Sequence, residues 1–218
     1  MKIGILGSGM VGQTIGSALI RAGHEIRIGT GHPEKADLVK WAQENRSAAS
    51  ISTFAQTAAF GEICFLCTNW AGTENALKLA GAAQFTDKLV LDVTNPLKNM
   101  APDAQGRLSF HTAPGISGGL QVQKWLPHAK VVKALNSIGF MYMDHPYFEE
   151  GNPTMFIAGN DETAKKSAAH LLHQLGWEDV QDIGNIDMSD SLEELCRIWC
   201  AIGFRTGSWT HAFRLVRK

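Results

Sequence analysis

A glycine-rich turn near the start of the chain most constrains what it can fold into. Residues 1–6 form a short apolar stretch typical of a strand, and the sequence GSGMVG follows at positions 7–12. This is a G-x-G-x-x-G motif, and apolar residues then recur at helical spacing up to residue 22. A strand, this motif and a helix in that order predict the first unit of an α/β fold that binds a dinucleotide.

Each glycine of the motif has a separate physical role. Gly7 allows the tight turn, Gly9 lets the backbone approach a pyrophosphate, and Gly12 lets the helix pack closely on the strand. Gly16 adds a small residue toward the sheet, and Gly23 closes the helix as a C-terminal cap. The helix N-terminus offers free N–H groups to phosphate. We therefore expect a pyrophosphate here; the alternative is a unit of this kind that has lost its ligand.

The end of the second predicted strand, at residues 24–28, indicates which dinucleotide binds. An NAD site normally carries Asp or Glu at this point, and positions 29–33 contain no acidic residue. Thr30 offers a hydroxyl, and His32 and Lys35 offer donor or cationic groups. The sequence therefore favours the 2′-phosphate of NADP, although ordinary surface polarity is the alternative reading of His32 and Lys35.

The composition of the 218-residue chain excludes several other classes. Its net charge is −1, so we expect no nucleic-acid partner. No apolar run is long enough to span a membrane, and the first predicted strand begins at residue 2, so we expect neither a membrane segment nor a signal peptide. We expect no metal site and a cytoplasmic protein, because the four cysteines read as buried small residues.

The spacing of the cysteines supports that reading. Cys64 and Cys67 lie three residues apart in a predicted strand, so their side chains point to opposite faces and cannot share a metal. Cys196 and Cys200 share a face of a predicted helix, but no matching pair of His or Cys residues is evident.

Strands and helices alternate along the chain, as a doubly wound α/β fold requires. Predicted strands lie near residues 2–6, 24–28, 48–51, 62–67, 88–92, 130–135, 154–158 and 180. Predicted helices lie near residues 11–22, 33–45, 53–59, 70–83, 119–126, 161–175 and 190–206. Ser191 is the expected N-terminal cap of the last helix, with Glu194 three residues on. We expect a Rossmann-type, mainly parallel sheet in residues 1–185 and a short helical segment at 186–218.

Polar residues stand where several predicted strands end. Ligands of parallel sheets bind beyond the carboxyl ends of the strands. Thr68, Asn69 and Trp70 end the fourth strand, Asn95 the fifth and Asn136 the sixth. Their side chains can bind the ribose and carboxamide of the nicotinamide half. Trp70 reads equally well as a core residue, and Asn95 as a turn residue.

The usual acid–base groups are absent from obvious positions. The sequence shows no Ser-His-Asp pattern, H-E-x-x-H motif or P-loop. His111, in a long polar loop at 98–119, is the best candidate for a site histidine, although surface polarity is the commoner reading. Hydride transfer between a nicotinamide and a flavin-like ring depends mainly on holding the two rings face to face. The sequence therefore favours that chemistry over carbonyl reduction.

Several segments together resemble the coenzyme F420-dependent NADP oxidoreductase family, and the similarity spans nearly the whole chain. They are GSGMVG at 7–12, Trp70 after a strand, DVTNPL at 92–97, KALN at 133–136, MFIAGND at 155–161, and Leu195, Trp199 and Arg205 in the last helix. The reductase domain of the six-transmembrane ferric reductases is also similar, and would imply a flavin acceptor.

The resemblance implies hydride exchange between NADPH and the 5-deazaflavin coenzyme F420, with a C-terminal helical part often used to form a homodimer. By position, the pyrophosphate would be held by Ser8, Gly9, Met10 and Val11, and the 2′-phosphate by Thr30 and Lys35, with His32 compensating for Gly31 where the family has arginine. The nicotinamide and acceptor ring would be surrounded by Thr68, Asn69, Trp70, Ile138 and Phe140.

Two other functions remain open from the sequence. Pyrroline-5-carboxylate reductases and 3-hydroxyacid dehydrogenases share the glycine-rich opening, but they add a large helical domain where only a short stretch follows the last predicted strand here. An imine or 2-hydroxyacid reductase is therefore one alternative. A non-catalytic sensor that binds NADP(H) is the other.

Overall fold

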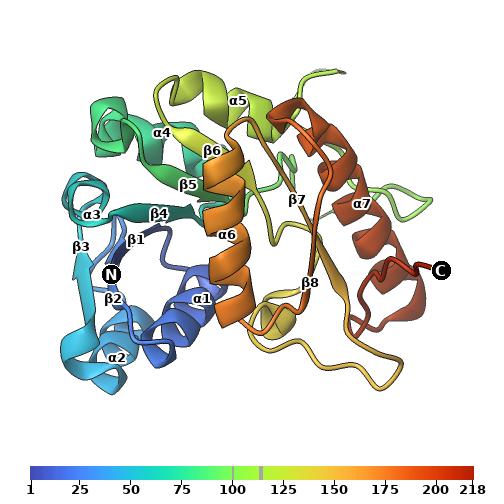
Figure 1. The fold of residues 1–218 in the computed structure, drawn as a ribbon, viewed down its shortest axis with the longest axis horizontal. Helices are drawn as coiled ribbons and strands as arrows, with labels where there is room; N and C mark the ends of the chain where they lie inside the picture. The colour runs from blue at the N-terminus through green and yellow to red at the C-terminus, as the bar shows by residue number, and fades with distance from the viewer. Residues whose placement is uncertain (100, 113–114) are drawn as a thin grey trace.

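The computed structural model describes residues 1–99, 101–112 and 115–218. The predicted loop at 98–119 includes the three residues outside these ranges. In the described part, eight strands form one sheet in the order β3-β2-β1-β4-β5-β6-β7-β8 (Figure 1). The strands are β1 (Lys2–Leu6), β2 (Glu25–Gly29), β3 (Ala49–Ser52), β4 (Ile63–Leu66), β5 (Leu89–Asp92), β6 (Lys130–Lys133), β7 (Thr154–Gly159) and β8 (Asp179–Asp182).

Strands β1 to β6 are parallel, whereas β7 runs antiparallel to β6 and β8 runs parallel to β7. The predicted Rossmann-type, mainly parallel sheet is therefore confirmed. The helices are α1 (Met10–Arg21), α2 (Ala36–Glu44), α3 (Phe54–Phe60), α4 (Trp70–Ala80), α5 (Gly118–Trp125), α6 (Glu162–Gln174) and α7 (Ser189–Thr206). Among the described residues, no helix combines the length and apolar character needed to cross a membrane.

Helices cover both faces of the sheet. The larger core cluster joins one face to α1, α2 and α6, through residues such as Ile15, Leu38 and Leu171. A second cluster joins the other face to α3, α4 and α5. Cys64 belongs to the second cluster while Cys67 packs against the first, which confirms that their side chains point to opposite faces. Figure 1 shows α6 crossing one face and α7 at the side of β7 and β8.

The chain after α7 folds back onto that helix. The rings of Trp199 and His211 stack with centroids 5.0 Å apart, and the Trp199 indole N–H donates to the His211 carbonyl oxygen at 2.8 Å. Further along, the Phe213 carbonyl oxygen accepts a hydrogen bond from the Thr154 N–H on β7. The C-terminal residues therefore tie α7 to the edge of the sheet.

Two predicted helix ends are wrong, each for a local reason. Ser191 is not the cap of α7, because a 3-10 turn at Ile186–Met188 runs directly into the helix, which begins at Ser189. The Ser191 hydroxyl instead contacts Asp190 within the first turn. Helix α4 stops at Ala80, short of its predicted end, because Gly81 takes a φ of +83°.

Candidate functional site

The glycine-rich turn has the geometry that its motif predicts. Gly7 has a φ of +118°, and a Cβ there would lie 2.5 Å from the Cys67 carbonyl oxygen. A Cβ on Gly12 would lie 2.2 Å from the Gly7 carbonyl oxygen, so α1 packs here only with glycine. A Cβ on Gly9 would meet no atom within 4 Å. Protein atoms therefore leave no room for a side chain at Gly7 and Gly12, whereas the space beside Gly9 is free for a ligand.

The N-terminus of α1 begins at this opening. Among the described residues, no side chain accepts a hydrogen bond from the first-turn N–H groups of α1, whereas Asn69 and Ser117 cap α4 and α5 in this way. The first turn of α1 also carries no acidic residue. The N–H groups of Met10 and Val11 are thus available to an anion, which is the arrangement that pyrophosphate binding requires.

The end of β2 lies beside the glycine-rich turn. The buried Thr30 hydroxyl accepts hydrogen bonds from the Ser8 hydroxyl at 3.0 Å and from the His32 N–H at 3.1 Å. His32 and Lys35 are exposed. The His32 Nδ1 atom lies 3.3 Å from a carboxylate oxygen of Glu34, an acid just beyond positions 29–33. The structure therefore brings Ser8 of the glycine-rich turn and Thr30 at the end of β2 together.

A cleft of about 400 Å³ opens between the N-terminus of α1 and the ends of β4 and β5. Its lining includes five residues predicted for the site: Val11, Thr68, Asn69, Trp70 and Asn95. It also includes Cys67, Ala71, Val93, Thr94, Leu97, Lys98 and Asn99. Ile138 and Phe140 do not belong to this lining; Ile138 is buried in the larger core cluster and Phe140 packs against it.

The polar residues of the cleft are held by the fold itself. Asn69 caps α4 by accepting from the Gly72 N–H at 2.9 Å. The Asn95 side-chain amide donates to the Asn136 carbonyl oxygen at 2.7 Å, and the Asn136 amide donates back to the Asn95 side-chain oxygen at 2.9 Å. The buried Oδ1 atom of Asn136 has no hydrogen-bond partner among the described residues. The pair therefore fixes the ends of β5 and β6 beside one another.

Trp70 is both a core residue and a wall of the cleft. Its side chain is only 8% exposed and belongs to the second core cluster. Its ring centroid lies 5.5 Å from that of Trp125, and Trp70 also lines the cleft. The two readings that the sequence left open are thus compatible.

The cleft offers little acid–base chemistry. Cys67 and Lys98 are the only titratable residues among the described ones that line it. Burial, with a smaller contribution from Asp92, raises the pKa of the Cys67 thiol far above its usual range, so it stays protonated and inert. His111 lines a neighbouring hollow with Glu74 and Trp125, and this hollow shares Trp70 and Ala71 with the cleft. The described residues include no group of three or more His, Cys, Asp or Glu able to hold a metal.

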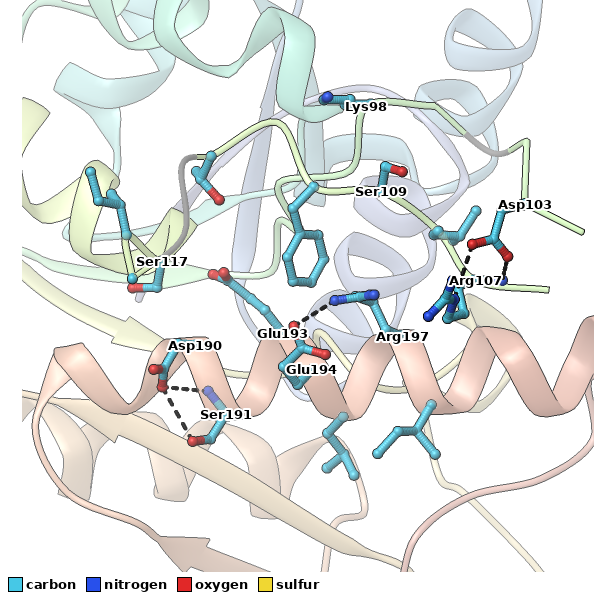
Figure 2. A pocket seen from close by; sticks show the side chains of 17 residues that line it. Lys98, Asp103, Arg107, Ser109, Ser117, Asp190, Ser191, Glu193, Glu194 and Arg197 are labelled. Atoms are coloured by element: carbon cyan, nitrogen blue, oxygen red, sulfur yellow. Dashed lines mark hydrogen bonds and ion pairs between the residues drawn. The ribbon is translucent and has the colours of Figure 1, made fainter. Parts of the chain in front are cut away.

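A larger cleft of about 970 Å³ lies between α7 and the loop that begins at Lys98, and Lys98 lines both clefts. Figure 2 shows its charged side chains, of which Arg197 pairs with Glu194 at 2.7 Å and Arg107 pairs with Asp103 at 3.0 Å. Since these two arginines are already paired, the cleft combines both signs of charge and carries no strong field of one sign.

A buried ionic cluster behind the clefts was missed by the sequence analysis. The Lys133 ammonium group is fully buried, 3.0 Å from a carboxylate oxygen of Asp92 and 3.0 Å from one of Glu193. Burial lowers the pKa of Lys133, but the two carboxylates outweigh it and hold that pKa above its ordinary value, so the lysine stays charged. The available signal was a charged residue at the carboxyl end of each of two neighbouring strands, Asp92 in β5 and Lys133 in β6.

The chain is similar to known reductases over its whole length. The family model described as NADP oxidoreductase, coenzyme F420-dependent, matches residues 2–96. An F420-dependent NADP reductase from Methanocaldococcus jannaschii is 30% identical over 99% of this chain and 98% of the relative. The crystal structure of a protein assigned as an F420-dependent NADP reductase, from Arthrobacter sp. FB24, is 34% identical with a TM-score of 0.90 over 100% of both chains.

A more distant structural match has a different activity. An imine reductase from Aspergillus terreus is 18% identical with a TM-score of 0.65, over 94% of this chain and 63% of that protein. At this level of identity the match shows a shared fold alone. More than a third of that protein has no counterpart in this chain.

Proposed function

Because this chain belongs to the coenzyme F420-dependent NADP oxidoreductase family and is an NADP-dependent oxidoreductase, we propose that it transfers a hydride between NADPH and a ring acceptor. The acceptor we propose is a deazaflavin, coenzyme F420, or a flavin. NADPH supplies the hydride, and the acceptor ring takes it up together with one proton from solvent.

The observation that carries this proposal is that the smaller cleft has few groups able to donate or accept a proton. Reduction of a carbonyl or imine needs a positioned proton donor beside the nicotinamide. Of the two titratable residues in the described lining, the Cys67 thiol is inert and Lys98 lies at the mouth shared with the larger cleft. Transfer of a hydride between two stacked rings depends chiefly on orientation, which the packed walls of this cleft supply.

The coenzyme would lie across the carboxyl ends of the strands, from β2 to β5. The open Gly9 and the free N-terminus of α1 fit a pyrophosphate, and the lack of an acid at positions 29–33 fits a 2′-phosphate. We assign pyrophosphate contacts to Gly7, Ser8, Gly9, Met10, Val11 and Gly12, and 2′-phosphate contacts to Thr30, His32 and Lys35. We assign the nicotinamide side to Thr68, Asn69, Trp70, Asn95 and Asn136, with Ile138 and Phe140 behind it.

The acceptor would approach from the larger cleft. This direction is favoured because Lys98 lines both clefts and because the larger one has room for a ring system with a side chain attached. The acceptor ring would then meet the nicotinamide at the mouth between Lys98 and Trp70.

The test is the oxidation of NADPH by the purified protein, followed optically, with F420, FMN, FAD and a ferric chelate as parallel acceptors. NADH in place of NADPH is the coenzyme control, and a cyclic imine is the substrate control. We expect rapid turnover with one ring acceptor and a clear preference for NADPH. Turnover with the imine alone would overturn the hydride-to-ring assignment, and binding of NADPH without turnover of any acceptor would indicate a sensor.

We also propose that the protein is a homodimer formed through the C-terminal segment at 186–218, with residues 1–185 as the NADP-binding domain. The outer face of α7 supports this, because Ile198 and Ile202 lie four residues apart with exposed fractions of 51% and 36%. Sedimentation velocity should give a dimer, and Ile202→Glu should give a monomer. A monomeric wild-type protein would contradict the assignment.

The free cysteines bear on the compartment in which the protein works. All four are free thiols, and three of them are buried. We propose a reducing compartment, the cytoplasm, since disulfides are rare there.

A further inference from the structure

The buried cluster of Asp92, Lys133 and Glu193 joins three elements behind the clefts. Asp92 ends β5, Lys133 ends β6 and Glu193 lies in the first turns of α7. All three side chains are at most 1% exposed. A buried ion cluster of this kind is weak evidence for stability, because well-packed apolar residues often serve as well. A contribution to stability therefore does not by itself explain why three charged side chains are buried here.

Hydrogen bonds satisfy every charge in the cluster. The second oxygen of Asp92 accepts from the Thr94 N–H at 3.0 Å and from the Thr94 hydroxyl at 2.7 Å. Lys133 also donates to the Thr94 carbonyl oxygen. The Glu193 carboxylate accepts from the N–H groups of Gly118 and Gly119 at 2.9 and 3.0 Å, where α5 begins. The cluster is thus rigid, with no free donor to rearrange.

The cluster holds two walls of the smaller cleft. Thr94 lines that cleft and takes three of the hydrogen bonds just described. Gly118 lies directly against Trp70, since a Cβ on it would approach the Trp70 ring to 3.1 Å and the Glu193 carboxylate to 3.0 Å. Glu193 holds the backbone of Gly118, which limits how closely the Trp70 ring can approach α5. Asp92 holds the backbone and hydroxyl of Thr94 by hydrogen bonds. Figure 2 shows Glu193 projecting from α7 toward Ser117, and both residues belong to the lining of the larger cleft.

We infer that Asp92, Lys133 and Glu193 are positioning residues for hydride transfer, which hold Thr94 and Trp70 where the donor and acceptor rings meet. The inference rests on the proposed function, because it takes the smaller cleft as the nicotinamide site. It adds that Lys133 links the acceptor-side helix α7 to the coenzyme-side strand β5 through one carboxylate on each. A displacement of about 1 Å at such a site can slow a reaction on the order of a hundredfold.

Glu193→Gln tests the inference with little risk to folding, because it leaves Lys133 and Asp92 as a balanced pair. The single oxygen of the glutamine amide cannot accept hydrogen bonds from the N–H groups of Gly118 and Gly119 and from Lys133 all at once. We expect the single-turnover rate of hydride transfer to fall at least about tenfold, while the Kd for NADPH changes less than about twofold. The single-turnover rate is the measure, since product release can hide changes in the transfer step.

Two further variants separate positioning from charge and from the general effect of removing a carboxylate. Glu193→Asp keeps the charge but is one methylene shorter, so it should also slow transfer; full activity in this variant would overturn the positioning role. Asp182→Asn is the control for removing a carboxylate from a lysine pair outside both clefts, because Asp182 pairs with Lys165, the other buried lysine of the described residues. Asp182 is 40% exposed, so this change should cost little stability and should leave the transfer rate unchanged.

The outcomes distinguish this inference from the proposed function. If the wild-type protein transfers hydride to no ring acceptor, the proposed function fails and the inference fails with it. If the wild-type protein is active and Glu193→Gln transfers hydride at the same rate, only the inference is wrong. If Glu193→Gln and Asp182→Asn slow transfer equally, the effect is not specific to this cluster, and the inference is again wrong.

Discussion

Gly9 is the residue whose replacement best separates ligand binding from folding. Its φ and ψ of −75° and −176° suit any residue, and a Cβ there would meet no protein atom within 4 Å. Gly9→Ala should therefore leave the melting temperature unchanged and weaken NADPH binding at least about tenfold, or 1.4 kcal/mol, by blocking the pyrophosphate. Isothermal titration with NADPH measures this effect.

Gly12→Ala provides the contrast to that variant. Its Cβ would collide with the Gly7 carbonyl oxygen, so this change should lower the melting temperature as well as the affinity. Unchanged NADPH affinity in Gly9→Ala would mean that the coenzyme does not cross the glycine-rich turn.

Thr30 governs the choice between the two coenzymes in our assignment. Aspartate at this position can still accept hydrogen bonds from the Ser8 hydroxyl and the His32 N–H, as Thr30 does. Its charge would repel a 2′-phosphate but accept a hydrogen bond from the 2′-hydroxyl of NADH. Thr30→Asp should therefore shift the ratio of Kd values at least about tenfold toward NADH. Retained preference for NADPH would place the 2′-phosphate elsewhere.

At the scale of single residues, prediction succeeded where the constraint is local. The roles of Gly7 and Gly12 follow from backbone sterics within one turn, so the motif alone was enough to predict them. The partnership of Lys133 with Glu193 was missed because it joins distant segments that meet only after α7 has docked. No spacing rule reports such a contact.

Among the elements, α3 depends most clearly on a single cap. It has only seven residues, and Thr53 and Gln56 form a reciprocal capping box at its start. Thr53→Ala should lower the free energy of unfolding by about 1 kcal/mol, because short helices rely on their caps. Urea unfolding measures the loss, and Thr53→Ser, which keeps the hydroxyl, should show little of it. NADPH affinity should not change in either variant.

The elements were predicted well where apolar periodicity is strong and poorly where turns compete. The strands and helices of the described sheet lie within a few residues of their expected positions. The expected cap at Ser191 failed because the preceding 3-10 turn supplies the first turn of α7 instead. The reversed direction of β7 had a signal in hindsight. The chain between β6 and β7 forms only a 3-10 turn at Phe140–Tyr142, whereas a parallel return usually crosses the sheet through an α-helix.

For the whole molecule, the buried lysine predicts how stability depends on pH. Asp92 and Glu193 outweigh desolvation and raise the pKa of Lys133 above its ordinary value, and Cys196 is the other titratable group beside it. The folded state therefore keeps this proton at higher pH than the unfolded chain does. Its contribution to stability is complete below about pH 10.4 and is lost as the pH rises through the folded-state value.

Urea unfolding at a series of alkaline pH values tests this dependence. The free energy of unfolding should fall above about pH 10.4, and it should fall less steeply in Glu193→Gln, where the lysine has lost one carboxylate. A steeper fall in that variant would contradict the assignment.

The shape of the clefts belongs to the whole molecule and could not be predicted from the sequence. The sequence placed Thr68, Asn69 and Asn95 at strand ends, and the structure puts all three in one lining. It could not show that Ile138 would be buried in the core, nor that α7 and the loop from Lys98 would enclose a second and larger space. Those features depend on how the C-terminal helix docks, which no local pattern encodes.

The bond between Lys133 and its two carboxylates has an evolutionary consequence. In our proposal the coenzyme half of the fold ends at β5 and the acceptor half is built from α5 and α7. Lys133 is held by one carboxylate from each of these parts, Asp92 and Glu193. Acceptor preference can therefore diverge through the loop from Lys98 and the residues of α7 that line the larger cleft, while the coenzyme half stays unchanged. The three charged positions cannot drift one at a time, so descendants of this chain should keep or exchange them together.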